Sequence, residues 1–450
     1  MIQVRPFALL LATILLTACG AVDIQERTGL PAEAATTPQA TSTPVPSPTP
    51  ATVTPVAELL TSPRKISAGS ICMLTGDWAP DGRTLAYASK GHIWLATAPD
   101  FTPRQLPIRG NQPKWSPAQH LATWYDGTYP NWYIQVFDLS GQLLHQMSLA
   151  LPKGALIDRW LDNERLTVVV HVGVPGQDLL EVNLREQTVR PLVSPEGGML
   201  STTVLSTGEI FHWSPDLRFL AVEHGTAVLP GKITLIDVTR REEIHLFQSL
   251  EERRFQQFEA WAPDSSRFLY EEMEGTNAPL ELATPSLFAW DVTKHQGHEI
   301  LPNVWGAAWS PTGEIAVRLV GNPIRDAQGQ ITGTDFLPGQ PFRAWIGVLE
   351  AHTYRVKALF PIGEVMDIGA FLADSPRCGP RRPVWSPDGA QLVYWDTQGR
   401  VWATTADGRR QWLLEAGGGV YAVAWSPDGA WLALSLEEKI LLLPRPEENP

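Results

Sequence analysis

One short phrase built around tryptophan returns along the chain, and it constrains the fold more than any other feature. The phrase reads Trp-Ser-Pro-Asp-Gly at Trp385 and Trp425, and Trp-Ala-Pro-Asp-Gly at Trp78. Shortened or degenerate copies of the phrase begin at Trp115, Trp160, Trp213, Trp261 and Trp309. Successive copies are 37, 45, 53, 48, 48, 76 and 40 residues apart. Eight units of similar content at such spacing indicate a repeat architecture.

One repeat, residues 382–414, reads as four short strands separated by turns. The Pro-Asp-Gly of the phrase predicts a tight turn, because Pro presets φ, Asp can bond its own backbone and Gly accepts a positive φ. Residues 391–395 are rich in β-formers, and further strands are expected at 400–404 and 410–414. Four antiparallel strands with regular turns make one propeller blade. We therefore expect an all-β, eight-bladed β-propeller of four-stranded antiparallel blades.

The two ends of the repeat region predict how the ring closes. The last repeat begins at Val420 and stops after its third strand, residues 439–443. At the other end, Ser-Pro-Arg-Lys-Ile at 62–66 resembles the fourth-strand sequence Thr-Pro-Arg-Gln-Leu at 102–106. We expect this N-terminal strand to complete the last blade, which would remove the exposed edges of an open sheet.

These repeats resemble the WD40-like propeller repeats of TolB and its relatives. The resemblance rests on the Trp-Ser-Pro-Asp-Gly phrase followed by a strand of the Leu-Ala-Tyr type, as at 85–87, and covers nearly all of residues 62–446. It implies a propeller, but the motif is generic within propellers. TolB has a separate N-terminal α/β domain, and prolyl-peptidase propellers are followed by a hydrolase domain. We recognise neither in this sequence and expect neither activity to carry over.

Residues 1–18 resemble a bacterial lipoprotein signal peptide. Arg5 supplies a weak positive charge, and residues 7–16 are apolar but too short to span a bilayer as a stable helix. The sequence Leu-Thr-Ala-Cys-Gly at 16–20 resembles a lipobox, in which Cys19 becomes the lipidated first residue. The alternative is an ordinary signal peptide with a chance cysteine. A lipidated Cys19 predicts an extracytoplasmic protein anchored to the cell membrane, since more than one acyl chain makes a stable anchor.

The region after Cys19 divides into a tether and a ring. Residues 19–60 are expected to form a disordered, lipid-anchored tether, residues 61–446 the propeller and residues 447–450 a tail. Residues 35–56 are almost all Ala, Thr, Pro, Ser, Val and Gln, without a charge. Such a composition cannot bury a core and favours an extended, polyproline-like chain.

Composition limits the classes of partner. The formal net charge is −13, from 35 Lys and Arg against 48 Asp and Glu, and the sequence has no basic stripe, so nucleic acid is not an expected partner. Besides Cys19, the chain has Cys72 and Cys378, each six or seven residues before a motif tryptophan and therefore expected at one end of the ring. Export favours disulfides. A Cys72–Cys378 bond is one interpretation, and two separate thiols are the other.

The sequence carries no recognised catalytic signature. It lacks the Gly-x-Ser-x-Gly, His-Glu-x-x-His and phosphate-loop patterns, and we expect no catalytic residue and no cofactor. His295 and His298 fall at a predicted hairpin turn, and the loop at 326–335 lacks the alternating acidic positions of a calcium site, so no metal is expected. The motif tryptophans are expected in the core between blades. The motif aspartates are expected as turn formers: Asp81, Asp216, Asp264, Asp388 and Asp428.

The long connections are expected at one end of the ring. Turns between strands one and two, and three and four, share one end of a blade, and the other connections share the opposite end. The first set is short, whereas the second contains the segments 194–206, 272–285, 321–341 and 362–380. Long loops concentrate function, and neutral drift would lengthen both ends alike. We therefore expect the long-loop end to be the binding face.

One long-loop connection is rich in aromatic residues. Tyr125, Tyr129, Trp132 and Tyr133 are candidate binding residues, because exposed aromatic rings suit a glycan or protein partner. We expect a membrane-anchored binding or scaffolding module for such partners. The alternative is an exported propeller enzyme, a glycan lyase or hydrolase with its site in the central funnel. That enzyme would need a convergent set of His, Asp and Arg side chains, which the sequence does not show.

Overall fold

The structure is a computed structural model, and it describes most of the repeat region. The described residues are 57–59, 63–67, 76–126, 131–150, 156–170, 178–193, 211–224, 232–245, 254–274, 285–336, 340–365, 382–416, 419–436 and 439–447. The chain divides into two units, Met1–Pro46 and Ser47–Pro450, and every described residue belongs to the second, which is compact. The described residues form strands and turns, and they contain no helix long and apolar enough to cross a membrane.

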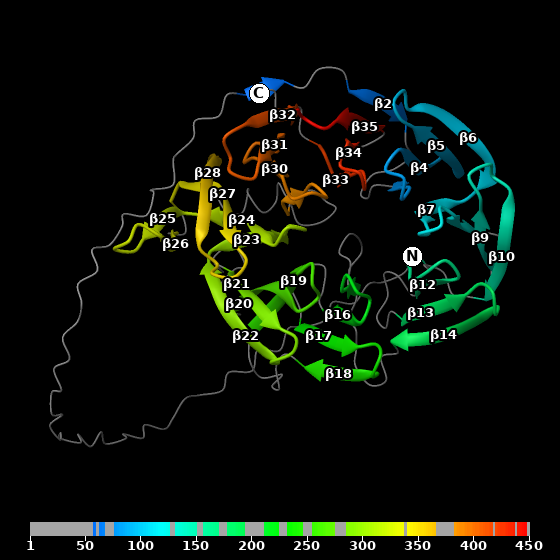
Figure 1. Cartoon of the computed structure of the whole chain (residues 1–450), viewed down its shortest axis with the longest axis horizontal. Coiled ribbons are helices and arrows are strands. Elements are labelled where there is room, and N and C mark those ends of the chain that lie inside the picture. Colours follow the sequence, from blue (N-terminus) through cyan, green and yellow to red (C-terminus); the bar gives the residue numbers. More distant parts are fainter. Residues whose placement is uncertain are drawn as a thin grey trace, which may run out of the picture. The chain divides into compact units, whose positions relative to one another are not determined.

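Eight four-stranded antiparallel blades build the second unit, with their fourth strands at the rim (Figure 1). Blade 1 consists of β3 (Gly76–Trp78), β4 (Thr84–Ser89), β5 (His92–Thr97) and β6 (Thr102–Arg109). Blade 2 consists of β7 (Asn111–Trp115), β8 (Leu121–Asp126), β9 (Asn131–Phe137) and β10 (Leu143–Ala150). Blade 3 consists of β11 (Leu156–Trp160), β12 (Arg165–Val170), β13 (Asp178–Asn183) and β14 (Thr188–Val193). Blade 4 consists of β15 (Phe211–Trp213), β16 (Phe219–His224), β17 (Lys232–Asp237) and β18 (Glu242–His245).

The second half of the unit repeats this pattern with two additions. Blade 5 consists of β19 (Arg254–Trp261), β20 (Arg267–Glu274), β21 (Ser286–Asp291) and β22 (Gln296–Pro302). Blade 6 consists of β23 (Val304–Trp309), β24 (Glu314–Val320), β27 (Phe342–Glu350) and β28 (Val356–Val365), with the inserted hairpin β25 (Asn322–Arg325) and β26 (Ile331–Asp335). Blade 7 consists of β29 (Val384–Trp385), β30 (Gln391–Trp395), β31 (Val401–Thr405) and β32 (Gln411–Glu415), with β1 (Ala57–Leu59) added. Blade 8 consists of β33 (Ala422–Trp425), β34 (Trp431–Leu436), β35 (Lys439–Pro444) and β2 (Arg64–Ser67). The predicted fold class is confirmed.

The N-terminal strand closes the ring as predicted. Strand β2 pairs antiparallel with β35, so that Ile66 lies opposite Ile440, and Ile66 is buried. The sequence did not indicate β1, which pairs in parallel with the rim strand β32 and places Ala57 opposite Gln411. Strand β1 lies at the end of the segment expected as the tether. The chain therefore joins two neighbouring blades, 7 and 8, before it begins blade 1.

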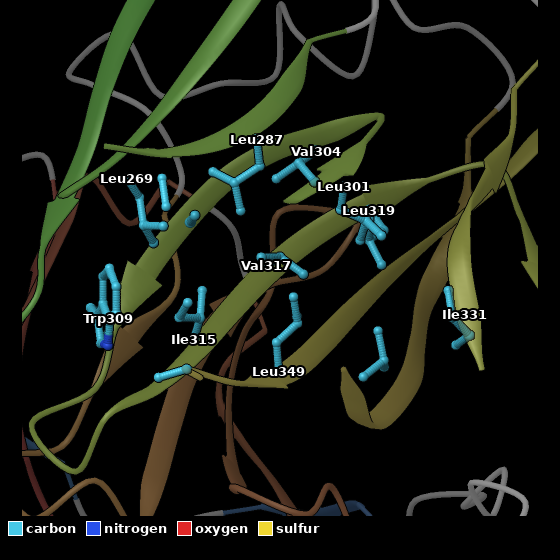
Figure 2. Close-up of a cluster of buried hydrophobic side chains, with 14 of the residues drawn as sticks. Leu269, Leu287, Leu301, Val304, Trp309, Ile315, Val317, Leu319, Ile331 and Leu349 are labelled. Carbon is cyan, nitrogen blue, oxygen red and sulfur yellow. The ribbon is translucent and has the colours of Figure 1, made fainter. Parts of the chain in front are cut away.

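Each neighbouring pair of blades shares a buried apolar cluster, and this includes blades 8 and 1. Figure 2 shows the cluster between blades 5 and 6, where Leu269 and Leu287 of blade 5 face Val317 and Leu319 of blade 6. Ile331 of the inserted hairpin belongs to the same cluster. Because each fully buried side chain of this kind contributes about 1.5–3 kcal/mol, the apolar seams are the main source of cohesion between blades.

The Ser-Pro-Asp-Gly turns form a recurring hydrogen-bond unit. In blade 7 the hydroxyl of Ser386 donates to Asp388 over 2.6 Å and accepts the backbone N–H of Gln391 over 2.9 Å. Blade 8 repeats this unit at residues 426–431, and blade 4 at residues 214–219. Gly389 has φ +71°, and a Cβ there would lie 2.5 Å from the hydroxyl of Thr312 in the neighbouring blade, so glycine is required. The prediction that the motif aspartates are turn formers is confirmed at Asp388.

The motif tryptophans are buried between blades, apart from the half-buried Trp261, and they tie blades together. The indole N–H of Trp115 donates to the carbonyl of Asp77, 3.0 Å away, and Asp77 directly precedes the motif tryptophan of the previous blade. We call this bond the indole latch. It recurs at Trp160 with Lys114, Trp261 with His212, Trp385 with Ala308 and Trp425 with Val384. At the ring-closing seam, the buried indole N–H of Trp78 has no hydrogen-bond partner.

Candidate functional site

Several predicted site residues lie outside the described part of the chain. They are Cys19, Cys72, Cys378 and Tyr129. The lipid anchor and the disulfide therefore stay predictions. Tyr125 is the fifth residue of β8, and its backbone pairs with Tyr133 of β9, so these two candidate residues lie in neighbouring strands of blade 2.

Trp132 packs into the fold instead of standing free on a loop. Its ring stacks on that of Trp124 with 5.2 Å between ring centroids, and it packs against the cluster between blades 2 and 3. Trp124, which flanks the same connection, is 4% exposed. Trp132 is thus half-buried, because the strands of blade 2 extend further than the turn signals indicated. A partner-binding role for Tyr125, Tyr129, Trp132 and Tyr133 stays a prediction.

The best-defined feature of the predicted binding face is the hairpin β25–β26, which interrupts blade 6 between its second and third strands. The amide of Asn303 donates to the carbonyl of Thr334 over 2.8 Å, and the hydroxyl of Thr334 donates to the carbonyl of Val320. The indole of Trp345 donates to the carbonyl of Gly321 over 2.8 Å. Residues 326–335, expected as a loop, thus form a turn and a strand that are fixed to the blade.

The outer strand of this hairpin presents an apolar side chain to solvent. Ile324 is 48% exposed, and its neighbour Arg325 is also exposed. Asp326 accepts the backbone N–H groups of Gln328 and Gln330, so its carboxylate shapes the turn. The hairpin is therefore a rigid support with one apolar contact point. In the described residues, no group of three or more His, Cys, Asp or Glu side chains is placed to hold a metal ion.

A cluster of charged residues, two of them buried and two half-buried, lies on the first and second strands of blades 4 and 5 and at the start of blade 7, and we call it the axial cluster. It consists of Glu223 of β16, Glu259 of β19, Glu271 of β20 and Arg382, which precedes β29. The Nε atom of Arg382 lies 3.0 Å from Oε2 of Glu259, but its N–H is not aligned for a hydrogen bond. Another guanidinium nitrogen of Arg382 donates to the carbonyl of Phe258 and, over 3.3 Å, to Oε1 of Glu259. Arg382 thus reaches from the start of blade 7 to blade 5.

Each acid of the axial cluster accepts a backbone N–H from the next blade. Glu223 of blade 4 accepts from Phe258 of blade 5 over 3.1 Å. Glu259 and Glu271 of blade 5 accept from blade 6, Glu259 from Ala307 over 2.8 Å and Glu271 from Gly306. These carboxylates therefore join the inner strands of blades 4, 5 and 6, a role that the indole latches play nearer the turns.

Burial dominates the electrostatics of the axial cluster. It raises the pKa of Glu259 to about 7, against the opposing effect of the Arg382 charge. Burial and then the charge of Glu259 raise the pKa of Glu271 well above its ordinary value. Beside them, Nε2 of His212 lies 3.6 Å from Glu223, and its ring stacks on Phe258 with 4.1 Å between centroids. The cluster can therefore hold a proton near neutral pH.

Sequence reasoning missed the axial cluster, although a signal existed. Glu259 stands in Phe-Glu-Ala-Trp and Glu271 in Leu-Tyr-Glu-Glu-Met, where acids interrupt apolar strand sequences. Such acids need buried partners, because an unpaired buried charge is costly. No local pattern points to Arg382, which is 123 residues away from Glu259.

A second feature lies at the opposite end of the ring, between the short turns of blades 4 and 5. It is a groove of about 760 Å³ with Phe219 and Val292 in its lining and a rim of charged residues. Within it, Arg218 donates to the buried carboxylate of Asp237 over 3.1 Å. The uniformly short turns gave no sign of this groove, because it arises from the spacing of two blades.

Comparisons with protein-family models and with curated proteins find no match. Among solved structures, the chain is similar to the Dos1 propeller, with a TM-score of 0.50, 14% identity, and coverage of 85% of this chain and 94% of that chain. It is also similar to TolB from Acinetobacter baumannii, with a TM-score of 0.33, 13% identity, and coverage of 75% and 77%. An oligogalacturonate lyase in complex with manganese gives a TM-score of 0.33 at 12% identity, with coverage of 71% and 97%. At 14% identity the likeness to the Dos1 propeller shows the propeller fold alone.

Proposed function

We propose that this protein is a membrane-anchored extracytoplasmic lipoprotein whose propeller binds a protein or glycan partner through its long-loop end. The observation that carries the binding role is the hairpin β25–β26. It is tied to blade 6 by hydrogen bonds from Asn303, Thr334 and Trp345, and it holds Ile324 48% exposed. Because the hairpin already holds Ile324 in place, a partner that covers this side chain would spend little free energy on ordering it.

The anchor is supported by the lipobox-like sequence around Cys19 and by the uncharged stretch at 35–56. Replacing Cys19 with Ala tests it by cell fractionation. We expect the variant to appear in the soluble fraction or to keep its leader. Normal processing with unchanged membrane retention would refute the anchor and leave the binding role standing.

The binding role is tested with the immobilised propeller and two probes, soluble peptidoglycan fragments and solubilised envelope proteins. We expect saturable binding of one probe that Ile324→Asp weakens at least tenfold, since central anchors commonly contribute about 2 kcal/mol or more. Val189→Asp is the matched control, because Val189 is 40% exposed but lies on the rim strand β14 of blade 3. Equal binding by the wild type and Ile324→Asp would contradict the proposed face.

The axial cluster favours one second candidate, an exported glycan lyase or hydrolase. Such an enzyme needs an acid or base whose pKa lies near neutrality, and burial brings the pKa of Glu259 to about 7 beside the guanidinium of Arg382. The test is release of new chain ends from a panel of polysaccharides by the wild type and by Glu259→Gln. Activity that survives Glu259→Gln would exclude this cluster as its source.

A further inference from the structure

Two buried acids of blade 5 bind consecutive amides of blade 6. Glu271 accepts the N–H of Gly306, and Glu259 accepts the N–H of Ala307 over 2.8 Å. In a regular strand consecutive N–H groups point in opposite directions. Here the pairing of β23 with β24 slips between Val304 and Ala307, and Gly306 has φ 105°, which turns both N–H groups toward blade 5. Since consecutive Cα atoms are about 3.8 Å apart, the two carboxyl groups are held close together.

The surroundings do not neutralise two negative charges at this point. Glu259 and Glu271 are each 4% exposed. Arg382 is the cation that faces them, Glu223 of β16 adds a third acid, and His212 of β15 faces Glu223 at 3.6 Å. Strand β23 has no ionisable side chain, as its sequence Val-Trp-Gly-Ala-Ala-Trp shows.

Two other buried ionisable side chains lie on the strands around this pair, and both lie on the far faces of their strands. Glu272, beside Glu271 on β20, accepts a hydrogen bond from the side chain of Gln256. Arg318 of β24 stands between Val317 and Leu319, which pack toward blade 5, so its own side chain lies on the face of β24 that packs toward blade 7. Burial raises the pKa of both Glu259 and Glu271, the charge of Glu223 adds to this at Glu259, and the charge of Glu259 adds to it at Glu271, which agrees with one retained proton. Like charges this close and this buried do not both ionise readily.

We propose that Glu259 and Glu271 share one proton, and that this proton fastens the inner strand of blade 6 to blade 5, so that its loss loosens the ring at that seam. Ionisation releases the proton to solvent and leaves two carboxylates against one guanidinium. Their repulsion is relieved by separating β19 and β20 from β23. The site is thus a contact between blades 5 and 6 whose strength one proton controls. It does not depend on which partner the ring binds.

The first test uses the full chain and two variants. Glu271→Gln imitates the protonated acid, because its amide oxygen can accept from Gly306 and its amide nitrogen can donate to Glu259. Glu272→Gln is the matched control, since it removes the neighbouring buried acid that Gln256 binds. The readout is the infrared C=O stretch of a protonated carboxyl group. We expect it in the wild type and in Glu272→Gln at pH 6, and not in Glu271→Gln or in the wild type at pH 9.

Hydrogen exchange of the peptide that contains residues 304–309 provides the second readout. Between pH 6 and pH 9, after correction for intrinsic exchange, we expect its protection in the wild type to fall at least about tenfold, and that of Glu271→Gln to stay constant. The proposal is overturned if the wild type shows no carboxyl band at pH 6, or if Glu271→Gln keeps the wild-type dependence on pH. It is also overturned if Glu271→Gln fails to fold at pH 6 where Glu272→Gln folds, because the native state would then require the ionised acid.

Discussion

The seam between blades 1 and 2 and the seam that closes the ring between blades 8 and 1 are built differently. In the first, Trp115 forms the indole latch with Asp77, whereas at the closing seam the indole of Trp78 is buried without a partner. There the edge of Phe101 meets Trp431 at 4.7 Å between centroids and Trp78 at 6.1 Å. The closing seam therefore depends on aromatic packing and on β2 from the other end of the chain. Blades that follow one another can use a polar bond, whereas the closing pair depends on apolar contact.

The largest effect is expected from removing the closing strand. Deleting residues 57–69 takes away β2, its pairing with β35 and the buried Ile66. Because folded domains are stable by only about 5–15 kcal/mol, the ring should open or aggregate. Thermal melting and size-exclusion chromatography measure this. Deleting residues 57–60 alone removes only β1 and should change little, and a 57–69 deletion that melts like the full chain would refute closure by β2.

A change of pH is expected to have an intermediate effect on the stability of the fold. On the alkaline side this effect should arise at the seam between blades 5 and 6. The pKa of Glu259 is raised to about 7, so the folded state binds more protons than the unfolded state above the ordinary value of 4.5. Stability should therefore fall as the pH rises from about 4.5 through 7.

The acid side of the pH dependence is expected to come from Asp388. Burial by itself would raise the pKa of Asp388, but hydrogen bonds from Ser386 and Arg445 outweigh burial and lower the pKa to about 2. Asp388 thus contributes stability above its ordinary pKa, and that contribution is lost as the pH falls toward 2.

Urea unfolding across pH 3–9 checks this prediction. We expect maximum stability in mild acid, near the point where Asp388 is ionised and the Glu259–Glu271 pair still holds its proton. Glu271→Gln should remove most of the decline between pH 5 and pH 8 and leave the acid side unchanged. A stability maximum at pH 8 would contradict the account.

The smallest effect tests the latch itself. Trp115 and Trp78 are both 7% exposed, so a change to Phe removes the same ring atoms from two similarly buried positions. Trp115→Phe also breaks the bond to Asp77, whereas Trp78→Phe removes an unpaired donor. We expect Trp115→Phe to cost about 1 kcal/mol more than Trp78→Phe, the usual net contribution of one hydrogen bond. Equal losses in chemical denaturation would show that the latch adds no stability.

The candidate sites were less predictable than the ring. The motif phrase pointed to turns and strands, but Trp132 looked like an exposed anchor and instead stacks on Trp124. The reason is that side-chain exposure depends on where a strand ends and on which blade covers it. For the same reason, the contact between Arg382 and Glu259 joins two blades that only the closed ring brings together.

What the sequence by itself determined is the blade and its repetition. Turn chemistry is local, because the bonds of Ser386 and Asp388 and the positive φ of Gly389 arise within one turn, and eight copies of the tryptophan phrase specify eight blades. The match of residues 62–66 to a fourth strand also specified closure. Only the tertiary structure decided the fastening of Glu259 and Glu271 to consecutive amides, the addition of β1 to blade 7, and the groove between blades 4 and 5. These features depend on the distance between separate blades, which no segment of the sequence encodes alone.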